Sequence, residues 1–272
     1  RHTRLQGDWS SDVCSSDLGR GELTAVVPVA GLDRRMPRDL LISLRDSHDP
    51  MARQELRCFR DTTGLDLDIV HASETTLDDR LLDGTRCLFF GGSGAYSVLD
   101  PHPWVRNMLD FLVHVVDRKV PAWASCFGFQ GLALALGGEV NRDDARQELG
   151  AFPIDLTAAG LADPLFGSLP STFYAQLGHH DHVDRLPAGV TLLATGRAIH
   201  NQAFKVDGAP FWATQFHPEL NRSTTTERWN YYREHYAGDP QTAADIDHRM
   251  ATGPDTLESQ AVLANFANWV RR

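Results

Sequence analysis

The sequence predicts an α/β protein built on a doubly wound, mainly parallel sheet with helices on both faces. Three observations support this prediction. Strand-like and helix-like segments alternate along residues 39–130, which is typical of βαβ units. The segment from Cys87 to Phe90 is apolar at consecutive positions, as expected for a parallel strand buried on both faces. With 272 residues, 42% of them hydrophobic, and no long apolar run, the chain can bury one sizeable core.

The first half of the chain contains the alternating elements. Apolar or alternating runs predict strands at 39–44, 65–71, 86–90 and 120–124. Helical periodicity predicts helices at 51–62 and 104–116, and a short polar-apolar segment predicts a third at 78–83. Because strands and helices alternate, we expect these strands to lie parallel.

The second half of the chain changes character. Short stretches interrupted by glycines predict a small antiparallel region at 137–156 and 172–176, followed by strands at 190–195, 199–206 and 211–216. Beyond residue 221 the pattern is helical. Capping boxes are expected at Thr224 with Glu227 and at Asp255 with Glu258. We therefore expect residues 222–272 to be a helical extension that packs on the same domain.

The first nineteen residues do not fit this pattern. They lack apolar periodicity and a signal-peptide core, and the run D-V-C-S-S-D-L is similar to translated sequencing-adapter read-through. We interpret residues 1–19 as non-native or disordered, and expect the main domain, residues 37–221, to begin near Pro37.

Composition excludes several classes of protein. The net charge of −10, with no basic stripe, argues against nucleic-acid binding. No stretch is long and apolar enough to predict a transmembrane segment, so no membrane partner is expected. The four cysteines are too sparse for a disulfide framework or a zinc site, and a reducing cytoplasm is the expected location.

The segment from Val120 to Gln130 is the strongest chemical signal. A short apolar strand turns at Ser125-Cys126-Phe127-Gly128 into an apolar helix, which is typical of a nucleophile elbow. The helix N-terminus should lower the pKa of the Cys126 thiol, and the turn should leave the side chain partly exposed. The alternative is that Cys126 is a small buried hydrophobe.

A second motif supports the reactive interpretation. A strand-like run ends at His217, and Glu219 follows two residues later. An imidazole oriented by a carboxylate can act as the base for a thiol that the fold brings beside it. Cys126, His217 and Glu219 are therefore the candidate catalytic triad.

Together these motifs resemble the class I (triad-type) glutamine amidotransferases, particularly the glutaminase domain of GMP synthase. The family's motifs are G-x-C-x-G-x-Q and H-P-E. Cys126, Gly128, Gln130 and the His217-Pro218-Glu219 run match, whereas Ala124 replaces the first glycine. The resemblance covers roughly residues 39–221. It implies a flavodoxin-like arrangement of the sheet and places Gln130 near bound glutamine.

The glycine-rich segment after the strand at 86–90 has a counterpart in the family. Glycines at the end of a strand can present free N–H groups to developing negative charge. The family motif is G-G-P-x-S-V, and the resemblance implies that Gly92, with Phe127, supplies the oxyanion amides. Ser93-Gly94 stands where proline is usual. An ordinary strand-to-helix turn is the alternative.

The histidine-rich run from His179 to His182 is not expected to bind metal, because consecutive residues on an extended chain cannot all face one ion. The family carries S-H-x-D-x-V here, so the resemblance implies that His179 and Asp181 border the glutamine pocket. Gly178 replaces the serine. A surface turn that satisfies its own hydrogen bonds remains the alternative.

The resemblance implies that the chain hydrolyses the glutamine side-chain amide through a cysteine thioester, without a cofactor, and releases ammonia to an acceptor or synthase partner. A free-standing hydrolase of γ-glutamyl peptides or amides is the second interpretation, because no nucleotide-binding loop is evident. A non-catalytic regulatory module is the third, and the presence of every triad member disfavours it.

Overall fold

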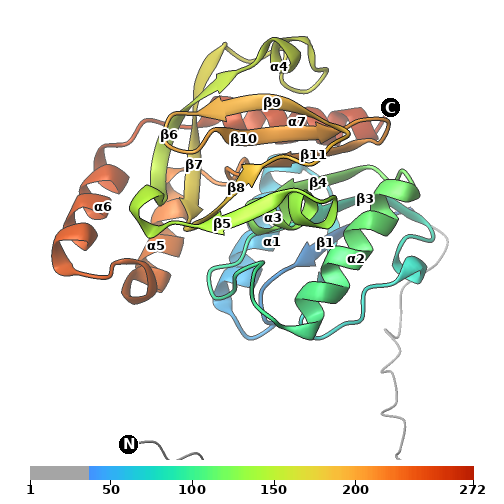
Figure 1. The fold of residues 1–272 in the computed structure, drawn as a ribbon, viewed down its shortest axis with the longest axis horizontal. Coiled ribbons are helices and arrows are strands. Elements are labelled where there is room, and N and C mark those ends of the chain that lie inside the picture. Colours follow the sequence, from blue (N-terminus) through green and yellow to red (C-terminus); the bar gives the residue numbers. More distant parts are fainter. Residues whose placement is uncertain (1–36) are drawn as a thin grey trace, which may run out of the picture. The chain divides into compact units, whose positions relative to one another are not determined.

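The computed structural model describes residues 37–272, and those residues have an α/β topology (Figure 1). The expectations for residues 1–19 lie outside the described residues. The strands are β1 (Arg38–Ser43), β2 (Leu67–His71), β3 (Thr85–Phe90), β4 (Ala122–Ser125), β5 (Glu139–Arg142), β6 (Glu148–Leu156), β7 (Thr172–His179), β8 (Asp181–Arg185), β9 (Val190–Gly196), β10 (Asn201–Val206) and β11 (Phe211–Thr214). The helices are α1 (Pro50–Thr63), α2 (Pro103–Asp117), α3 (Phe127–Ala135), α4 (Ala158–Ala162), α5 (Arg222–Tyr236), α6 (Pro240–Thr252) and α7 (Leu257–Val270).

Nine strands form one sheet in the order β2-β1-β3-β4-β11-β10-β9-β6-β7. The strands from β2 to β11 pair in parallel. From β11 onward every pair is antiparallel. The predicted fold class is confirmed, and the antiparallel strands extend the parallel sheet. Only β5 and β8 form a separate two-stranded ribbon in the described part of the chain.

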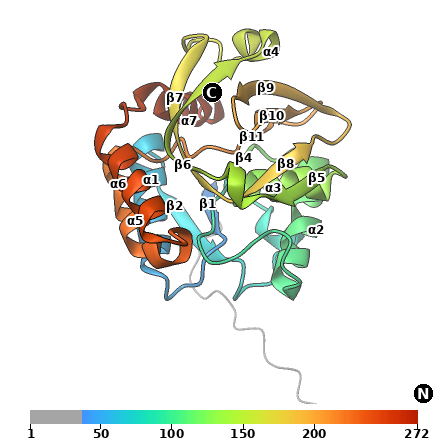
Figure 2. The same ribbon diagram turned by 60° about the vertical axis from the view of Figure 1, so that its left-hand side comes forward.

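Helices cover both faces of the parallel half (Figure 2). One face packs against α2 and α3 through a cluster that includes Leu88, Phe90 and Phe129. The other packs against α1 and α7 through a cluster that includes Phe89 and Phe266. Phe89 and Phe90 point to opposite faces because successive side chains alternate along a strand, and both are fully buried.

The sequence placed some helix ends incorrectly. The N-cap of α5 lies three residues before the expected cap: it is Asn221, and its capping box is made with Thr224. Helix α7 begins after Thr256, which makes no side-chain capping bond. The helix expected at 78–83 is a single 3-10 turn, Asp79–Leu81. Any of several Ser, Thr, Asp or Asn residues can cap a helix, so local spacing alone did not identify the one used.

The three C-terminal helices pack differently. The buried residues of α7 include Val262, Leu263 and Phe266, which belong to the core beneath the sheet. Helices α5 and α6 lie beside each other (Figure 1) and form a smaller cluster with Leu149 of β6. The described residues, 37–272, all belong to one compact unit.

Candidate active site

Cys126 lies on a strained turn between β4 and α3. Its φ of 53° and ψ of −102° lie in a region that non-glycine residues rarely adopt. The turn also needs a glycine close by, because a Cβ at Gly128 would lie 2.8 Å from the Cβ of Phe90. The elbow interpretation of the sequence therefore matches the backbone.

The environment of the thiol differs from what we expected. Cys126 is only 4% exposed. Its Sγ lies 3.8 Å from the carbonyl oxygen of Gly178 and 3.8 Å from Nε2 of Gln215. Burial, followed by the nearby Glu219 carboxylate, raises the pKa of the Cys126 thiol to about 12. The expected lowering of the pKa and the expected partial exposure were wrong, because burial outweighs the field of the helix N-terminus.

His217 and Glu219 lie on the chain just beyond β11. His217 Nδ1 lies 2.6 Å from Oε1 of Glu219, and its backbone N–H donates to the carbonyl of Gln176 on β7. Burial acts to raise the pKa of the Glu219 carboxyl, but the charge of and hydrogen bond from His217, with the charge of Arg228, lower it below its ordinary value. An ionised carboxylate only accepts, so Nδ1 of His217 donates in this hydrogen bond.

Cys126 and the imidazole of His217 both lie close to Gly92. A Cβ added there would lie 2.7 Å from Cε1 of His217 and 3.6 Å from Cβ of Cys126. The fold therefore brings together the cysteine and histidine that the sequence paired. It also explains a glycine at this position, since the Cβ of any other residue would be too close to the imidazole of His217.

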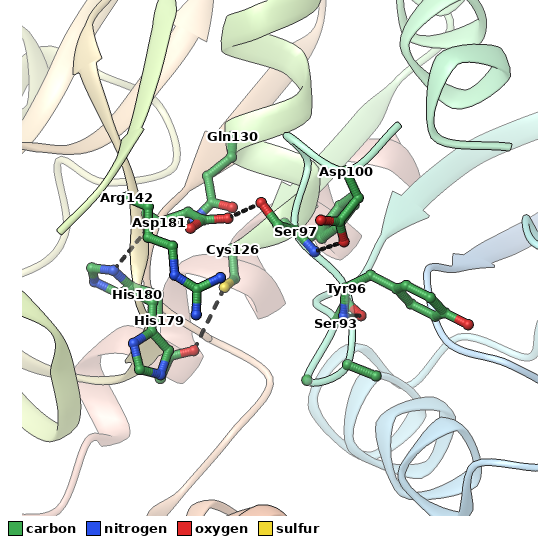
Figure 3. A pocket seen from close by; sticks show the side chains of 14 residues that line it. Ser93, Tyr96, Ser97, Asp100, Cys126, Gln130, Arg142, His179, His180 and Asp181 are labelled. Atoms are coloured by element: carbon green, nitrogen blue, oxygen red, sulfur yellow. Dashed lines mark hydrogen bonds between the residues drawn. The ribbon is translucent and has the colours of Figure 1, made fainter. Parts of the chain in front are cut away.

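A pocket of about 160 Å³ opens over Cys126 (Figure 3). Gln130, His179 and Asp181 all line it. Gln130 Nε2 donates to the backbone carbonyl of Asp181 at 2.7 Å, and both ring nitrogens of His179 are engaged, by that same carbonyl and by Glu148. These two side chains shape the wall of the pocket.

Asp181 has a buried acceptor oxygen that is not committed to a hydrogen bond within residues 37–272. Its Oδ2 accepts from the Ser97 hydroxyl. Its Oδ1 is buried and has no hydrogen-bond partner within residues 37–272. Asp100 and the half-exposed Arg142 also line the pocket and add one charge of each sign. A carboxylate with a free acceptor oxygen, together with a nearby cation, can bind a ligand group that carries one charge of each sign.

The two amides assigned to the oxyanion are in different states. Phe127 is the first residue of α3, where N–H groups lack intrahelical acceptors. The N–H of Gly92 instead donates to Oε1 of the buried Glu55 at 3.0 Å. Gly92 is therefore placed next to the triad, but its amide is directed to a carboxylate of the protein.

Sequence reasoning missed three neighbours of the triad. Gln215 had a readable signal, because it precedes His217 by two residues and would share its face of an extended chain. Arg228 on α5 had none: its Nη1 lies 3.5 Å from Oε1 of Glu219 although it belongs to the C-terminal helices. Glu55 also had none, because only tertiary packing brings α1 to Gly92.

Comparison with known proteins identifies the family to which this site belongs. The family described as glutamine amidotransferase class-I matches residues 43–232, which is more than half of the chain. The chain belongs to the class I glutamine amidotransferases. The match extends into α5, beyond the limit at residue 221 that the motifs suggested.

Two relatives are GMP synthases. The glutamine-hydrolysing GMP synthase of Christiangramia forsetii is 35% identical over 146 residues, covering 53% of this chain and 26% of the relative. A glutamine-hydrolysing GMP synthase subunit of Methanocaldococcus jannaschii is 31% identical over 115 residues, covering 42% of this chain and 57% of the relative. The chain therefore matches about a quarter of the first and just over half of the second.

Solved structures support the fold. A glutamine amidotransferase of Methylobacillus flagellatus has a TM-score of 0.65 at 20% identity, covering 87% of this chain and 95% of that one. One from Thermotoga maritima has a TM-score of 0.63 at 19% identity, covering 86% and 97%. Within residues 37–272, no helix has the length and apolar character needed to cross a membrane.

Proposed function

We propose that the chain is a glutaminase that hydrolyses the side-chain amide of glutamine and releases ammonia for an acceptor. The observation that carries this proposal is the placement of both Cys126, which lines a polar pocket, and His217, which is paired with Glu219, close to Gly92. Membership of the class I glutamine amidotransferases supports it.

In this mechanism the Cys126 thiol is neutral at rest, because its pKa is raised to about 12. His217 Nε2 takes the thiol proton as Sγ attacks the amide carbon, and Glu219 stabilises the imidazolium that forms. The oxyanion accepts a hydrogen bond from the Phe127 N–H and, once it is available, from that of Gly92. His217 then protonates the amide nitrogen and the C–N bond breaks. Ammonia departs, and a γ-glutamyl thioester remains on Cys126. Water activated by His217 releases glutamate and restores the thiol.

Substrate recognition follows from the charges of the pocket. The free Oδ1 of Asp181 would accept from the α-ammonium group of glutamine. Arg142 would contact the α-carboxylate. No cofactor enters any step. The M. jannaschii relative is named as one subunit of a GMP synthase, which supports the proposal that this chain passes ammonia to a synthase partner.

A free-standing hydrolase of γ-glutamyl compounds is the second candidate. The side chain of Arg142 is 51% exposed, so this cation could also receive an anionic extension of a larger substrate. A panel of glutamine and γ-glutamyl peptides, assayed for glutamate release, separates the two. A higher kcat/KM for a peptide than for glutamine would select the hydrolase.

The triad is tested by three variants assayed for ammonia release from glutamine. Cys126→Ala should abolish turnover while circular dichroism shows an intact fold, because the nucleophile is lost. His217→Ala should be nearly as severe. Glu219→Gln should be milder, with kcat reduced about 10²-fold or more, since base and nucleophile remain. Wild-type activity in Cys126→Ala, or acylation of another residue by a glutamine-analogue alkylator, would reject the assignment.

A further inference from the structure

The peptide unit between Gly91 and Gly92 is held at both ends. Its carbonyl oxygen accepts from the N–H of Gly128 on α3 at 3.2 Å. Its N–H donates to Oε1 of Glu55 at 3.0 Å. In a trans peptide the C=O and N–H point in opposite directions. The two bonds therefore fix the orientation of this peptide plane beside the triad.

Glu55 is built into a buried charged cluster. It is 0% exposed, and its Oε1 lies 3.5 Å from Nε of Arg45 and 3.7 Å from Nη2 of Arg228. Its Oε2 is buried without a hydrogen-bond partner within residues 37–272. A carboxylate between two guanidinium groups is held in place as an acceptor, and hydrogen bonds to such a group are stronger than those between neutral groups.

One N–H cannot make a strong bond to Glu55 and to a substrate oxygen at the same time. For the Gly92 amide to act on an oxyanion over Cys126, the peptide plane must rotate and give up both of its present bonds. Both residues of the unit are glycines, which tolerate the backbone angles that rotation passes through. Arg45 and Arg228 would continue to neutralise Glu55 once its bond to Gly92 is lost.

We propose that Glu55 is a positioning residue that latches the Gly91–Gly92 peptide in a resting orientation, so that turnover requires release of the latch. The proposal rests on the proposed glutaminase function. The acceptor of the Gly92 N–H, Glu55, belongs to α1, which is far in sequence from the turn at Cys126 and from His217. The latch keeps the oxyanion site incomplete and so limits glutamine hydrolysis by the resting protein.

The test compares the full-length chain with Glu55→Gln and Glu55→Ala. The Glu55→Gln substitution keeps the shape of the side chain but replaces the carboxylate by a neutral acceptor. The Glu55→Ala substitution removes the acceptor. We expect kcat for glutamine to rise about tenfold in Glu55→Gln with KM nearly unchanged, because the resting orientation loses a charge-assisted bond. Gln54→Ala is the matched control: this neighbour on α1 is buried and contacts Arg228 but not Gly92, and it should give no such gain.

A second measurement does not depend on turnover. Hydrogen exchange of the Gly92 amide, followed by NMR, should be slow in the wild type and faster in both Glu55 variants, and unchanged in Gln54→Ala. An unprotected Gly92 amide in the wild type would overturn the proposal. So would folded Glu55 variants whose kcat stays level or falls, or a gain in Gln54→Ala as large as theirs.

The outcomes also distinguish this proposal from the proposed function. If Cys126→Ala releases ammonia as fast as the wild type, the glutaminase assignment itself fails. If wild-type turnover depends on Cys126 but neither Glu55 variant is faster, only the latch fails.

Discussion

The Cys126 thiol is buried although it occupies the turn that was expected to expose it. The strand β4 and the helix α3 are both in the core, and the carbonyl oxygen of Gly178 and Nε2 of Gln215 each lie 3.8 Å from the sulfur. Removal of water disfavours the thiolate more than the helix N-terminus favours it. In the proposed mechanism the nucleophile is therefore generated by proton transfer to His217, rather than stored as a thiolate.

This state of the thiol predicts an unusual pH dependence of alkylation. With a pKa of about 12, the thiolate fraction of Cys126 should grow about tenfold per pH unit across the accessible alkaline range. Iodoacetamide labelling between pH 7 and 10 should therefore accelerate without a plateau. Because Cys58 and Cys87 are also buried thiols with raised pKa values, labelling must be read by mass spectrometry of the Cys126 peptide. A plateau below pH 9 would contradict the buried neutral thiol.

At the scale of elements, α7 belongs to the core rather than to a detachable tail. The ring centroid of Phe266 lies 5.4 Å from that of Phe89, in an edge-on arrangement, and 5.8 Å from that of Trp123, in a tilted one. Its side chain is fully buried. The last helix thus packs beneath β3 and β4, which carry the glycine loop and the elbow.

Truncation of this ring should be costly. Phe266→Ala should lower the free energy of unfolding by about 3–5 kcal/mol, because a large cavity is left under the sheet. Urea denaturation followed by circular dichroism measures the change. The matched control on the same helix is Leu257→Ala, since Leu257 is 68% exposed and its loss should stay within about 0.5 kcal/mol. Equal effects of the two substitutions would mean that α7 does not pack as described.

Helix α5 has a different role, because it brings a cation to the triad. Arg228 Nε donates to Gln54 on α1 at 2.7 Å, while its terminal nitrogens lie near Glu219 and Glu55. Tyr232, one turn further, lies against Gly94, where an added Cβ would be 2.5 Å from the ring. The helix that follows H-P-E therefore contacts both Glu219, the candidate acid, and the loop at Gly94.

At the scale of the whole molecule, binding of glutamine should raise the thermal stability of the protein. A ligand that binds only the folded state raises the free energy of unfolding by about 2.7 kcal/mol when its concentration is a hundred times its Kd. Glutamine should raise the Tm of the inert Cys126→Ala protein. The double variant Cys126→Ala/Asp181→Asn should lose most of this shift, because the α-ammonium group loses its carboxylate.

A control and a contrary result complete this prediction. Arg185→Ala in the same background removes an exposed pair with Glu139 and should keep the full shift. Calorimetry with increasing glutamine measures the shift. No change of Tm at any glutamine concentration would reject the recognition of free glutamine and favour a larger substrate.

The sequence by itself determined the parallel half of the fold and the three catalytic candidates. Alternating strand-like and helix-like runs identify βαβ units, because the buried face of a helix or a strand requires apolar residues at a regular spacing that can be read from the sequence. The H-P-E run places acid and base two residues apart, so their hydrogen bond is nearly local. The strand and the tight turn around Cys126 likewise depend on neighbouring residues.

Only the tertiary structure decided the burial of Cys126, the contact of Arg228 with Glu219, and the bond from Gly92 to Glu55. Each depends on side chains from elements far apart in sequence, and no periodicity within one element reports which remote group will face it. The pKa of a thiol and the partner of an amide are set by that three-dimensional surrounding. The sequence therefore named the candidate reacting groups, while tertiary packing set the burial of Cys126 and placed Glu55 of α1 and Arg228 of α5 beside them.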